Sequence, residues 1–322
     1  MVFGDFVVFL MIATVTLNPS LDEWMHLAVL RPGQLNRARH FARYAGGKGI
    51  NVSRVIHELG EPTIAYALAG GDDGEILRRA MNTLAIRHEF VEGRGTTRNN
   101  YKIQTAVPAA VTEINTEGPT VSAASLRRLS QRLLKHTPSP RCVALCGSLP
   151  PGAPSTTYRQ WIRTLRRRGI PAVLDASGTA LRHGVASRPW LIKPNRQEAE
   201  ELLRRRLMSL REVVRAALEL LSRGPAVVIL SLGREGAVLA SAAPRGVWLA
   251  RPPAIRVKSA VGAGDALVGG FLVGWMTRHP LLEAFRLGVA CGAATAMTSG
   301  TELCHRADVR RLLPRVSIRR IL

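Results

Sequence analysis

Two glycine-rich segments carry side chains that could take part in phosphate chemistry. The first reads AGGKGINVS over residues 45–53, and the second reads VGAGDALVGG over residues 261–270. Glycines before a helix let the backbone approach a ligand closely, and the N–H groups and dipole at a helix N-terminus attract an anion. An apolar stretch with helical spacing follows each segment, so both predict a loop that leads into a helix, the first helix spanning 52–59.

The second segment also supplies a carboxylate in the first turn of its helix. Asp265 directly follows Gly262, Ala263 and Gly264. If the N–H groups of this turn hold a transferring phosphoryl group, a carboxylate beside them can take the proton of an attacking hydroxyl. An aspartate in the first turn also stabilises a helix without any catalytic role. The segment alone leaves both interpretations open.

Neither segment fits the common nucleotide-binding patterns. A GxxxxGK[ST] loop would need a glycine and a hydroxyl residue where the chain has Ala42 and Gly49. A dinucleotide fingerprint would need a third glycine where the second segment has Leu267. The first segment, taken by itself, could also be a simple tight turn.

The elements that hold these segments follow an α/β pattern from about residue 140 onward. Strands are expected over 142–146, 172–175, 190–193 and 226–230, and helices over 158–168, 197–203 and 211–222. This alternation predicts a mostly parallel sheet with helices on both faces. We expect one domain over 11–322, with its first core strand near 12–17 and an N-terminal extension over residues 1–10.

Polar residues follow several of these strands at their carboxyl ends. They occur at Gly147 and Ser148, at Asp175, and over 193–195 and 231–233. Ligands of open α/β sheets bind at this edge, so we expect the site to lie there. The N-terminal third instead contains β segments without intervening helices, over 21–30, 37–44, 101–106 and 111–114. They predict a small extra sheet, either a lid or a plain edge extension.

Composition and charge limit the class of function. The net charge is +22, yet no nucleic-acid motif accompanies it and aromatic residues make up only 5% of the chain. We therefore expect solvated arginines and no specific nucleic-acid site. The apolar run over 7–17 is too short to span a bilayer, and no signal peptide is evident, so no membrane association is expected. Four cysteines without metal or disulfide spacing favour a cytoplasmic protein.

Together, the two glycine segments resemble the ribokinase/PfkB family of carbohydrate kinases. The spacing of Asn51, Ser53, Gly60 and Gly70 matches the family's first signature, and GAGDALVGG matches its second. Further matches are TLNPSLDE (16–23), TTRNN (96–100), TEIN (112–115), CGSLPPG (146–152), LDASG (174–178), IKPNRQE (192–198), ILSLGREGA (229–237) and GTELC (300–304). KPNxxE and GSLPPG are typical of the phosphofructokinase branch. The resemblance implies a ribokinase-like α/β fold with a small β-sheet lid.

The resemblance also implies a role for each matching residue. Asp265 is the catalytic base, and the backbone of 262–264 forms the anion hole. The substrate-binding residues are Asp22, Gly46, Gly47 and Asn51 for the sugar, and Arg98, with Lys48 and Arg37 as helpers, for the phosphate already on the substrate. The nucleotide-binding residues are Lys193, Asn195, Ser231, Gly233 and Gly236. Asn195 and Glu198 would organise Mg²⁺ and its waters near the ATP phosphates.

The implied reaction is the phosphorylation of fructose 1-phosphate to fructose 1,6-bisphosphate by MgATP. Lys48 and the TEIN stretch favour this branch or tagatose-6-phosphate kinase, and Gln34 stands where the minor 6-phosphofructokinases often carry lysine. Both of those kinases remain alternatives. A non-catalytic sugar-phosphate or nucleic-acid binding protein is the alternative of another class, and it would be expected to have lost Asp265 or Glu198. The family further implies a homodimer formed through the lid.

Overall fold

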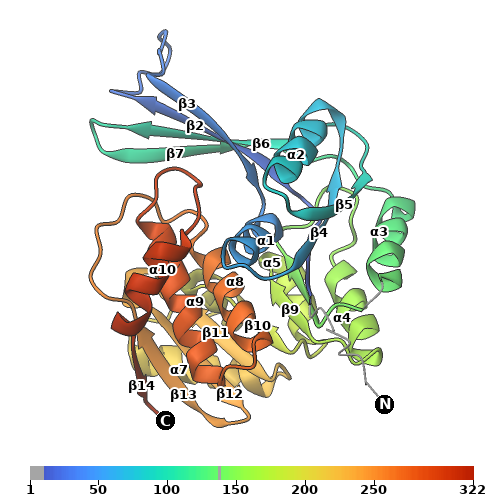
Figure 1. Ribbon diagram of the computed structural model, residues 1–322, viewed down its shortest axis with the longest axis vertical. Coiled ribbons are helices and arrows are strands. Elements are labelled where there is room, and N and C mark those ends of the chain that lie inside the picture. The colour runs from blue at the N-terminus through green and yellow to red at the C-terminus, as the bar shows by residue number, and fades with distance from the viewer. Residues whose placement is uncertain (1–10, 137–138) are drawn as a thin grey trace, which may run out of the picture.

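The computed structural model describes residues 11–136 and 139–322, which form one large and one small sheet (Figure 1). The expected extension over residues 1–10 lies outside these ranges. The strands of the large sheet are β1 Ile12–Thr16, β4 Thr63–Ala69, β5 Arg87–Glu92, β8 Cys142–Cys146, β9 Ala172–Asp175, β10 Leu191–Ile192, β11 Val227–Ser231, β12 Ala237–Ala242, β13 Arg245–Arg251 and β14 Ser317–Arg320.

The order of these strands shows where a ligand site is expected. It runs β14-β13-β12-β11-β10-β9-β8-β1-β4-β5, with parallel pairing from β5 to β11 and antiparallel pairing beyond. From β1 the chain continues to β4 and β5 on one side and to β8 through β11 on the other. The order therefore reverses next to β1, where open α/β sheets bind ligands. The predicted fold class is confirmed.

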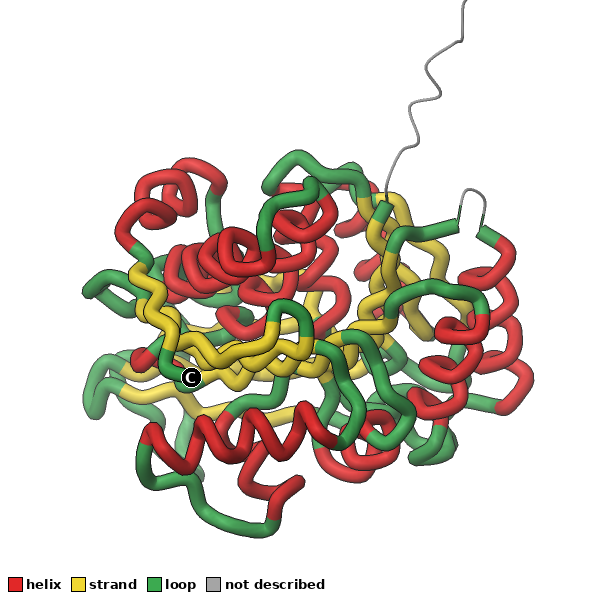
Figure 2. Tube along the Cα trace, turned by 90° about the horizontal axis from the view of Figure 1, so that it is seen from below, coloured by secondary structure: helices red, strands yellow, loops and turns green. Residues whose placement is uncertain are grey.

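Helices cover both faces of the large sheet (Figure 2). One layer consists of α3 Ala123–Lys135, α4 Thr157–Arg167, α5 Gly178–Val185, α6 Arg196–Leu203 and α7 Leu210–Ser222. The other consists of α1 Lys48–Glu58, α8 Ala263–Met276, α9 Leu281–Ala296 and α10 Arg306–Leu312. α2, Gly71–Thr83, packs against β4 and β5. No helix in the described ranges is long and apolar enough to cross a membrane.

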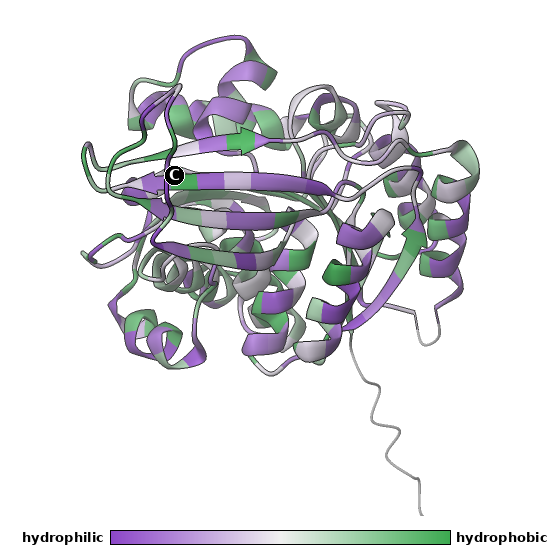
Figure 3. Ribbon diagram, turned by 90° about the horizontal axis from the view of Figure 1, so that it is seen from above, coloured by the Kyte–Doolittle hydropathy of each residue, from purple (hydrophilic) through white to green (hydrophobic). Residues whose placement is uncertain are grey.

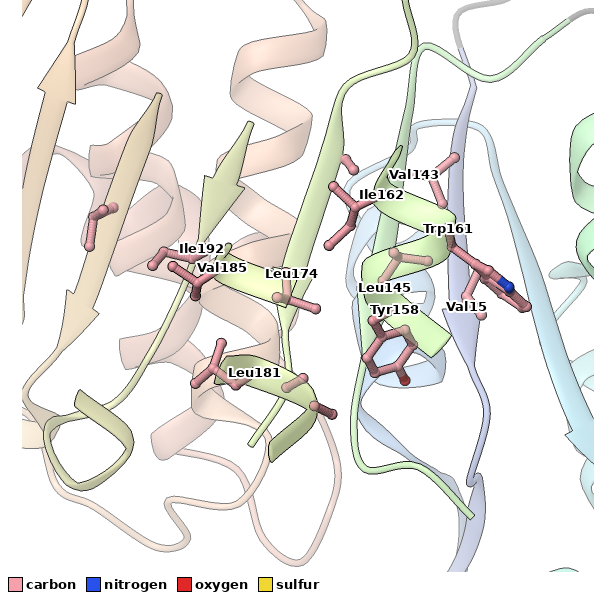
Figure 4. Close-up of a cluster of buried hydrophobic side chains, with 14 of the residues drawn as sticks. Val15, Val143, Leu145, Tyr158, Trp161, Ile162, Leu174, Leu181, Val185 and Ile192 are labelled. Atoms are coloured by element: carbon pink, nitrogen blue, oxygen red, sulfur yellow. The ribbon is translucent and has the colours of Figure 1, made fainter. Parts of the chain in front are cut away.

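Alternating apolar residues fix the inner strands between these layers. Val15 and Leu145 point into the first layer, where they pack with Tyr158 and Trp161 of α4 (Figure 4). Tyr158 is fully buried and its hydroxyl donates to the Cys146 carbonyl at 2.9 Å. Burying a side chain of this kind contributes about 1.5–3 kcal/mol. This packing holds the carboxyl ends of β1 and β8 in place beneath the site.

The small sheet contains the four β segments expected in the N-terminal third. Its strands are β2 Ser20–Leu27, β3 His40–Gly46, β6 Arg98–Thr105 and β7 Ala110–Asn115, in the order β3-β2-β6-β7. It projects from the upper edge of the body, and Figure 3 shows hydrophilic and hydrophobic residues mixed along its strands. The Trp24 indole N–H donates to the Thr301 hydroxyl at 2.6 Å, so one face of this sheet contacts the body. This contact favours a lid over an edge extension.

One predicted helix boundary is wrong. α1 begins at Lys48, four residues before the expected start, because Gly47 serves as its N-cap with a φ of 108°. That backbone conformation suits glycine and ends the preceding lid strand abruptly. Lys48 and Asn51 are therefore neighbours on the first turns of a helix, not members of a loop.

Candidate active site

Charged side chains meet at the carboxyl ends of β9 and β10. Asp175, the last residue of β9, is fully buried; its Oδ1 accepts from Lys48 Nζ at 2.9 Å, and its Oδ2 lies 3.4 Å from Lys193 Nζ. Burial alone would raise the pKa of Asp175, but Lys193 and Lys48 hold it below its ordinary value. For the cation Lys48, burial alone would lower the pKa, but Asp175, Glu198 and Asp265 together raise it above its ordinary value. Both groups are therefore charged at neutral pH.

Asp265 faces this cluster from the first turn of α8. Its side chain is buried, and Oδ2 accepts a hydrogen bond from Asn51 Nδ2 at 2.8 Å. Burial and the nearby Asp175 raise the pKa of Asp265 to about 6, while Lys48 and the Asn51 hydrogen bond act in the opposite direction. A carboxylate with this pKa is ionised at neutral pH and basic enough to accept a proton from a hydroxyl group during a reaction.

The N-terminus of α8 presents backbone N–H groups to the same place. Gly262 is the N-cap with a φ of 79°, and a Cβ there would lie 2.7 Å from Leu303 Cδ2, so both conformation and space require glycine. Lys193 Nζ lies 3.4 Å from the position that a Cβ on Gly264 would occupy. A phosphoryl group at this turn would meet a helix N-terminus and an ammonium group together.

The KPNRQE segment forms the start of α6. Asn195 Oδ1 accepts from the Glu198 N–H at 2.8 Å, and Glu198 Oε2 accepts from the Asn195 N–H at 2.9 Å, which is a capping box. Glu198 Oε1 also lies 3.5 Å from Lys48 Nζ. The motif thus has a structural role as a helix cap and also faces the charged cluster.

The remaining nucleotide-side residues lie beside this cap. Ser231 ends β11, and its N–H donates to the Pro194 carbonyl at 3.0 Å. The short helix η1, Gly233–Glu235, follows it. At Gly236, φ is 96° and a Cβ would lie 2.0 Å from the Ala250 carbonyl oxygen, so no other residue fits there. These residues continue the strand-end edge away from Asp265.

The lid contributes a second polar cluster. Asp22 of β2 is 3% exposed; its Oδ2 lies 2.7 Å from Lys102 Nζ, and its Oδ1 accepts from Asn100 Nδ2 at 2.9 Å and from Ser20 Oγ at 3.0 Å. A Cβ on Gly46 would lie 2.7 Å from Asp22 Oδ1, so the glycine leaves room for this carboxylate. Lys102 had no predicted role, although the period of two along β6 places it on the same face as Asn100.

Arg98 begins β6 at the base of the lid. Its Nη1 donates to Asn100 Oδ1 at 2.8 Å and its Nε to the Asn18 carbonyl at 3.3 Å. Burial lowers the pKa of the guanidinium, and Asp22 opposes that effect. The side chain is partly exposed, so the guanidinium is held in position and can still meet an anionic ligand.

Arg37 is not brought to this cluster within one chain. It lies exposed in the loop between β2 and β3, whereas Gly46 pairs with Ser20 at the opposite end of the same two strands. β2 is 8 residues long. At about 3.3 Å per residue, its two ends are roughly 25 Å apart. Within one chain Arg37 is therefore distant from Arg98, and its role as a helper in phosphate binding stays a prediction.

An α/β sheet with a lid, and an aspartate at a helix N-terminus facing two lysines, together define a phosphotransferase of the sugar-kinase class. A family model described as "pfkB family carbohydrate kinase" matches residues 15–308. The chain belongs to this family.

Relatives of the chain include two kinds of phosphofructokinase. It is 36% identical over 311 residues to the 1-phosphofructokinase of Bacillus subtilis, covering 97% of this chain and all of the relative. It is 34% identical over 301 residues to an ATP-dependent 6-phosphofructokinase isozyme 2 of Mycobacterium tuberculosis, covering 93% of this chain and 88% of the relative. Phosphofructokinase-2 of Escherichia coli, solved in complex with substrates and products, superimposes with a TM-score of 0.89 at 30% identity, covering 95% and 99% of the two chains.

Proposed function

We propose that the protein is an ATP-dependent sugar-phosphate kinase that converts fructose 1-phosphate to fructose 1,6-bisphosphate. The observation that carries this proposal is the placement of Asp265 at the N-terminus of α8, between a lysine–aspartate cluster and a lid that carries Asp22 and Arg98. The Bacillus subtilis relative named 1-phosphofructokinase supports fructose 1-phosphate as the substrate. Fructose 6-phosphate and tagatose 6-phosphate need the same groups and remain alternatives.

Each site residue has a separate role in the proposed reaction. Asp22 and Asn51 orient the sugar hydroxyls, and Arg98 binds the phosphate that the sugar already carries. Asp265 takes the proton of the attacking sugar hydroxyl while the oxygen of that hydroxyl forms a bond to the γ-phosphorus of ATP. The bond between this phosphorus and the ADP oxygen breaks, and ADP leaves. The α8 N-terminus and Lys193 stabilise the charge of the phosphoryl group in transfer. The lid excludes water, so that the phosphoryl group is not lost to hydrolysis.

Mg²⁺ fits this site as an ion bound to the nucleotide phosphates, with few or no direct protein ligands. No group of three or more acidic, histidine or cysteine side chains positioned for a metal occurs within 11–136 and 139–322. Both side chains of the capping box accept backbone hydrogen bonds, but carboxylate oxygens have further lone pairs for metal-bound water. Asn195 and Glu198 would therefore hold waters of the ion, which would neutralise charge on the ATP phosphates.

Steady-state assays of the purified protein with the three sugar phosphates test the substrate. We expect kcat/KM with MgATP to be highest for fructose 1-phosphate. The variant Glu219→Gln, on the surface of α7, should give the same ranking. An equal or higher kcat/KM for fructose 6-phosphate or tagatose 6-phosphate would overturn the assignment.

The pKa of Asp265 predicts the acid side of the pH profile. Since the base must be ionised, kcat should fall as the pH drops through about 6, where Asp265 becomes protonated. Turnover at saturating substrates across the acidic and neutral range measures this limb. A profile that stays flat well below that pH would remove Asp265 as the group that must be ionised.

A third expected result concerns Arg98. Arg98→Ala should lower kcat/KM for the sugar phosphate by about 2–4 kcal/mol in transition-state free energy, mainly through a higher KM, because a buried phosphate loses a charged donor. The KM for ATP should change far less. Equal effects on both substrates would mean that Arg98 acts only through the structure of the lid.

The outer face of the lid supports a homodimer formed through the two lids. Met25 pairs with Phe41 and with Ile103 across β2, and all three lie on the face opposite Asp22. Phe41 on β3 is 55% exposed, and Ile114 on β7, at the other edge of the sheet, is 53% exposed. Exposed apolar residues gathered on one face are typical of a protein interface. Phe41→Glu should convert a dimer into a monomer in sedimentation analysis.

We also propose a cytoplasmic location for this activity. All four cysteines are buried free thiols. Unpaired thiols suit a reducing compartment, which is also where ATP is available to a kinase.

A further inference from the structure

We propose that Arg54 is a positioning residue that, through Asn51, sets the orientation and basicity of the catalytic base Asp265. The proposal rests on the proposed function of Asp265. None of the matching motifs assigns a role to Arg54, and it does not touch the reacting atoms. Its place in the fold nevertheless links three segments that must be correctly arranged for catalysis.

Arg54 lies on α1, about one turn after Asn51. Its Nη1 donates to the carbonyl of Ala45 at 3.0 Å, to the carbonyl of Thr301 at 3.3 Å and to Asn51 Oδ1 at 3.4 Å. Ala45 belongs to lid strand β3, and Thr301 lies in the loop after α9 and also binds the lid residue Trp24. One guanidinium nitrogen thus joins the base of the lid, the sugar-binding helix and the loop beneath the lid.

The amide of Asn51 has one accepting end and one donating end. Its Oδ1 accepts from Arg54, and its Nδ2 donates to Asp265 Oδ2 at 2.8 Å. A flipped amide would turn its oxygen toward the Asp265 carboxylate and its NH₂ group toward the guanidinium, which would be unfavourable at both ends. The cation on one side and the anion on the other therefore specify the same orientation.

The orientation of the Asn51 amide matters because the groups around Asp265 shift the pKa of this base in opposite directions. Asp175 faces it from β9, Lys48 from α1, Lys193 from the segment after β10, and the neutral buried thiol of Cys146 from β8. Burial and Asp175 raise the pKa of Asp265, whereas the two lysines and the Asn51 hydrogen bond lower it. Loss of a correctly oriented Asn51 donor would raise this pKa, so less of the base would be ionised at a given pH.

Arginine suits this position better than lysine does. Its planar guanidinium can donate to several oxygens in fixed directions and stays charged when partly buried. Burial lowers the pKa of Arg54, with Asp22 the first group to oppose that effect, and an arginine remains protonated in either case. A lysine would supply a single mobile charge, and we expect it to hold the Asn51 amide less firmly.

The test compares Arg54→Met and Arg54→Lys with the wild-type enzyme by the pH dependence of kcat. We expect the acid limb to move to higher pH by about one unit in Arg54→Met, which lowers kcat about tenfold at a pH well below about 6 relative to its change on the plateau above both pKa values, and by less in Arg54→Lys. Arg78→Met is the matched control, because Arg78 is also partly buried, donates to the Phe90 carbonyl and lies away from the site on α2. Its acid limb should be that of the wild type.

A double-mutant cycle separates action through Asn51 from a general structural effect. Asn51→Ala should itself move the acid limb upward, and adding Arg54→Met should move it no further. An additive shift, or an unchanged limb in both Arg54 variants, would overturn the proposal. If Arg54→Met does not fold, the shift in Arg54→Lys decides between these outcomes. Full turnover in Asp265→Asn would instead remove the proposed function, which distinguishes the two failures.

Discussion

Asp265→Asn should lower kcat by about two to four orders of magnitude, because the proton of the attacking hydroxyl loses its acceptor. Asparagine has nearly the same shape, and its oxygen can still accept from Asn51 Nδ2, which lies 2.8 Å from the native carboxylate. The variant also removes one of three buried carboxylates, Asp175, Glu198 and Asp265, that surround Lys48, so it should fold at least as stably as the wild type. KM values for sugar phosphate and ATP should change little.

The control for this prediction addresses the purely structural interpretation of Asp265. Asp308 is likewise an aspartate in the first turn of a helix, α10, and it pairs with Arg311 at the surface. If Asp265 only stabilised a helix N-terminus, Asp265→Asn and Asp308→Asn should behave alike and both retain turnover. Single-turnover and steady-state rates of the two variants therefore decide between a catalytic and a structural role.

Sequence reasoning placed a residue correctly where a short, continuous segment of chain determines its position in the fold. Gly262 and Asp265 open a helix in one continuous segment, and the structure shows that helix. The strand-end rule likewise predicts Lys193 and Ser231 on one edge of the sheet, where the structure has them. In each case, a short stretch of chain determines both the element and the direction of the side chain.

The residues without a predicted role are those whose partners are distant in sequence. Asp175 meets Lys48 across 127 residues, and Lys102 meets Asp22 across 80. The pattern predicted the element that carries each side chain but not which strand lies beside it, because that depends on tertiary packing. Arg37 lies far from Arg98 within one chain for a related reason, since a lid segment can be recognised without knowing which end of it faces the site.

The fully buried carboxylate of Asp175 gives the second large effect. Asp175→Asn should destabilise the protein by about 3–5 kcal/mol, because it leaves two lysine charges without their partner. The Lys193 side chain is only 4% exposed, so water cannot replace the lost carboxylate there, whereas Lys48 keeps Glu198 nearby. The midpoint of urea unfolding measures this change.

Glu219→Gln is the matched control for the charge. Glu219 also pairs with two cations, Arg205 at 2.9 Å and Arg223 at 2.8 Å, but all three lie at the surface of the protein. Its loss should cost no more than about 1 kcal/mol, as is usual for exposed ion pairs. Equal destabilisation by the two variants would contradict the claim that burial makes the Asp175 cluster different.

Asp175→Asn should also change the pH dependence of kcat, in the direction opposite to its effect on stability. The pKa of Asp175 is held below its ordinary value, so its contribution to stability is present at neutral pH and is lost as the pH falls through that lowered pKa. At Asp265, however, the Asp175 charge raises the pKa, so its removal should move the acid limb of kcat to lower pH. A variant that is less stable, yet keeps a larger fraction of its own maximal kcat at acidic pH, would follow only if Asp175 and Asp265 interact directly. An upward shift of that limb in Asp175→Asn would show that the cluster controls Asp265 by packing and not by charge.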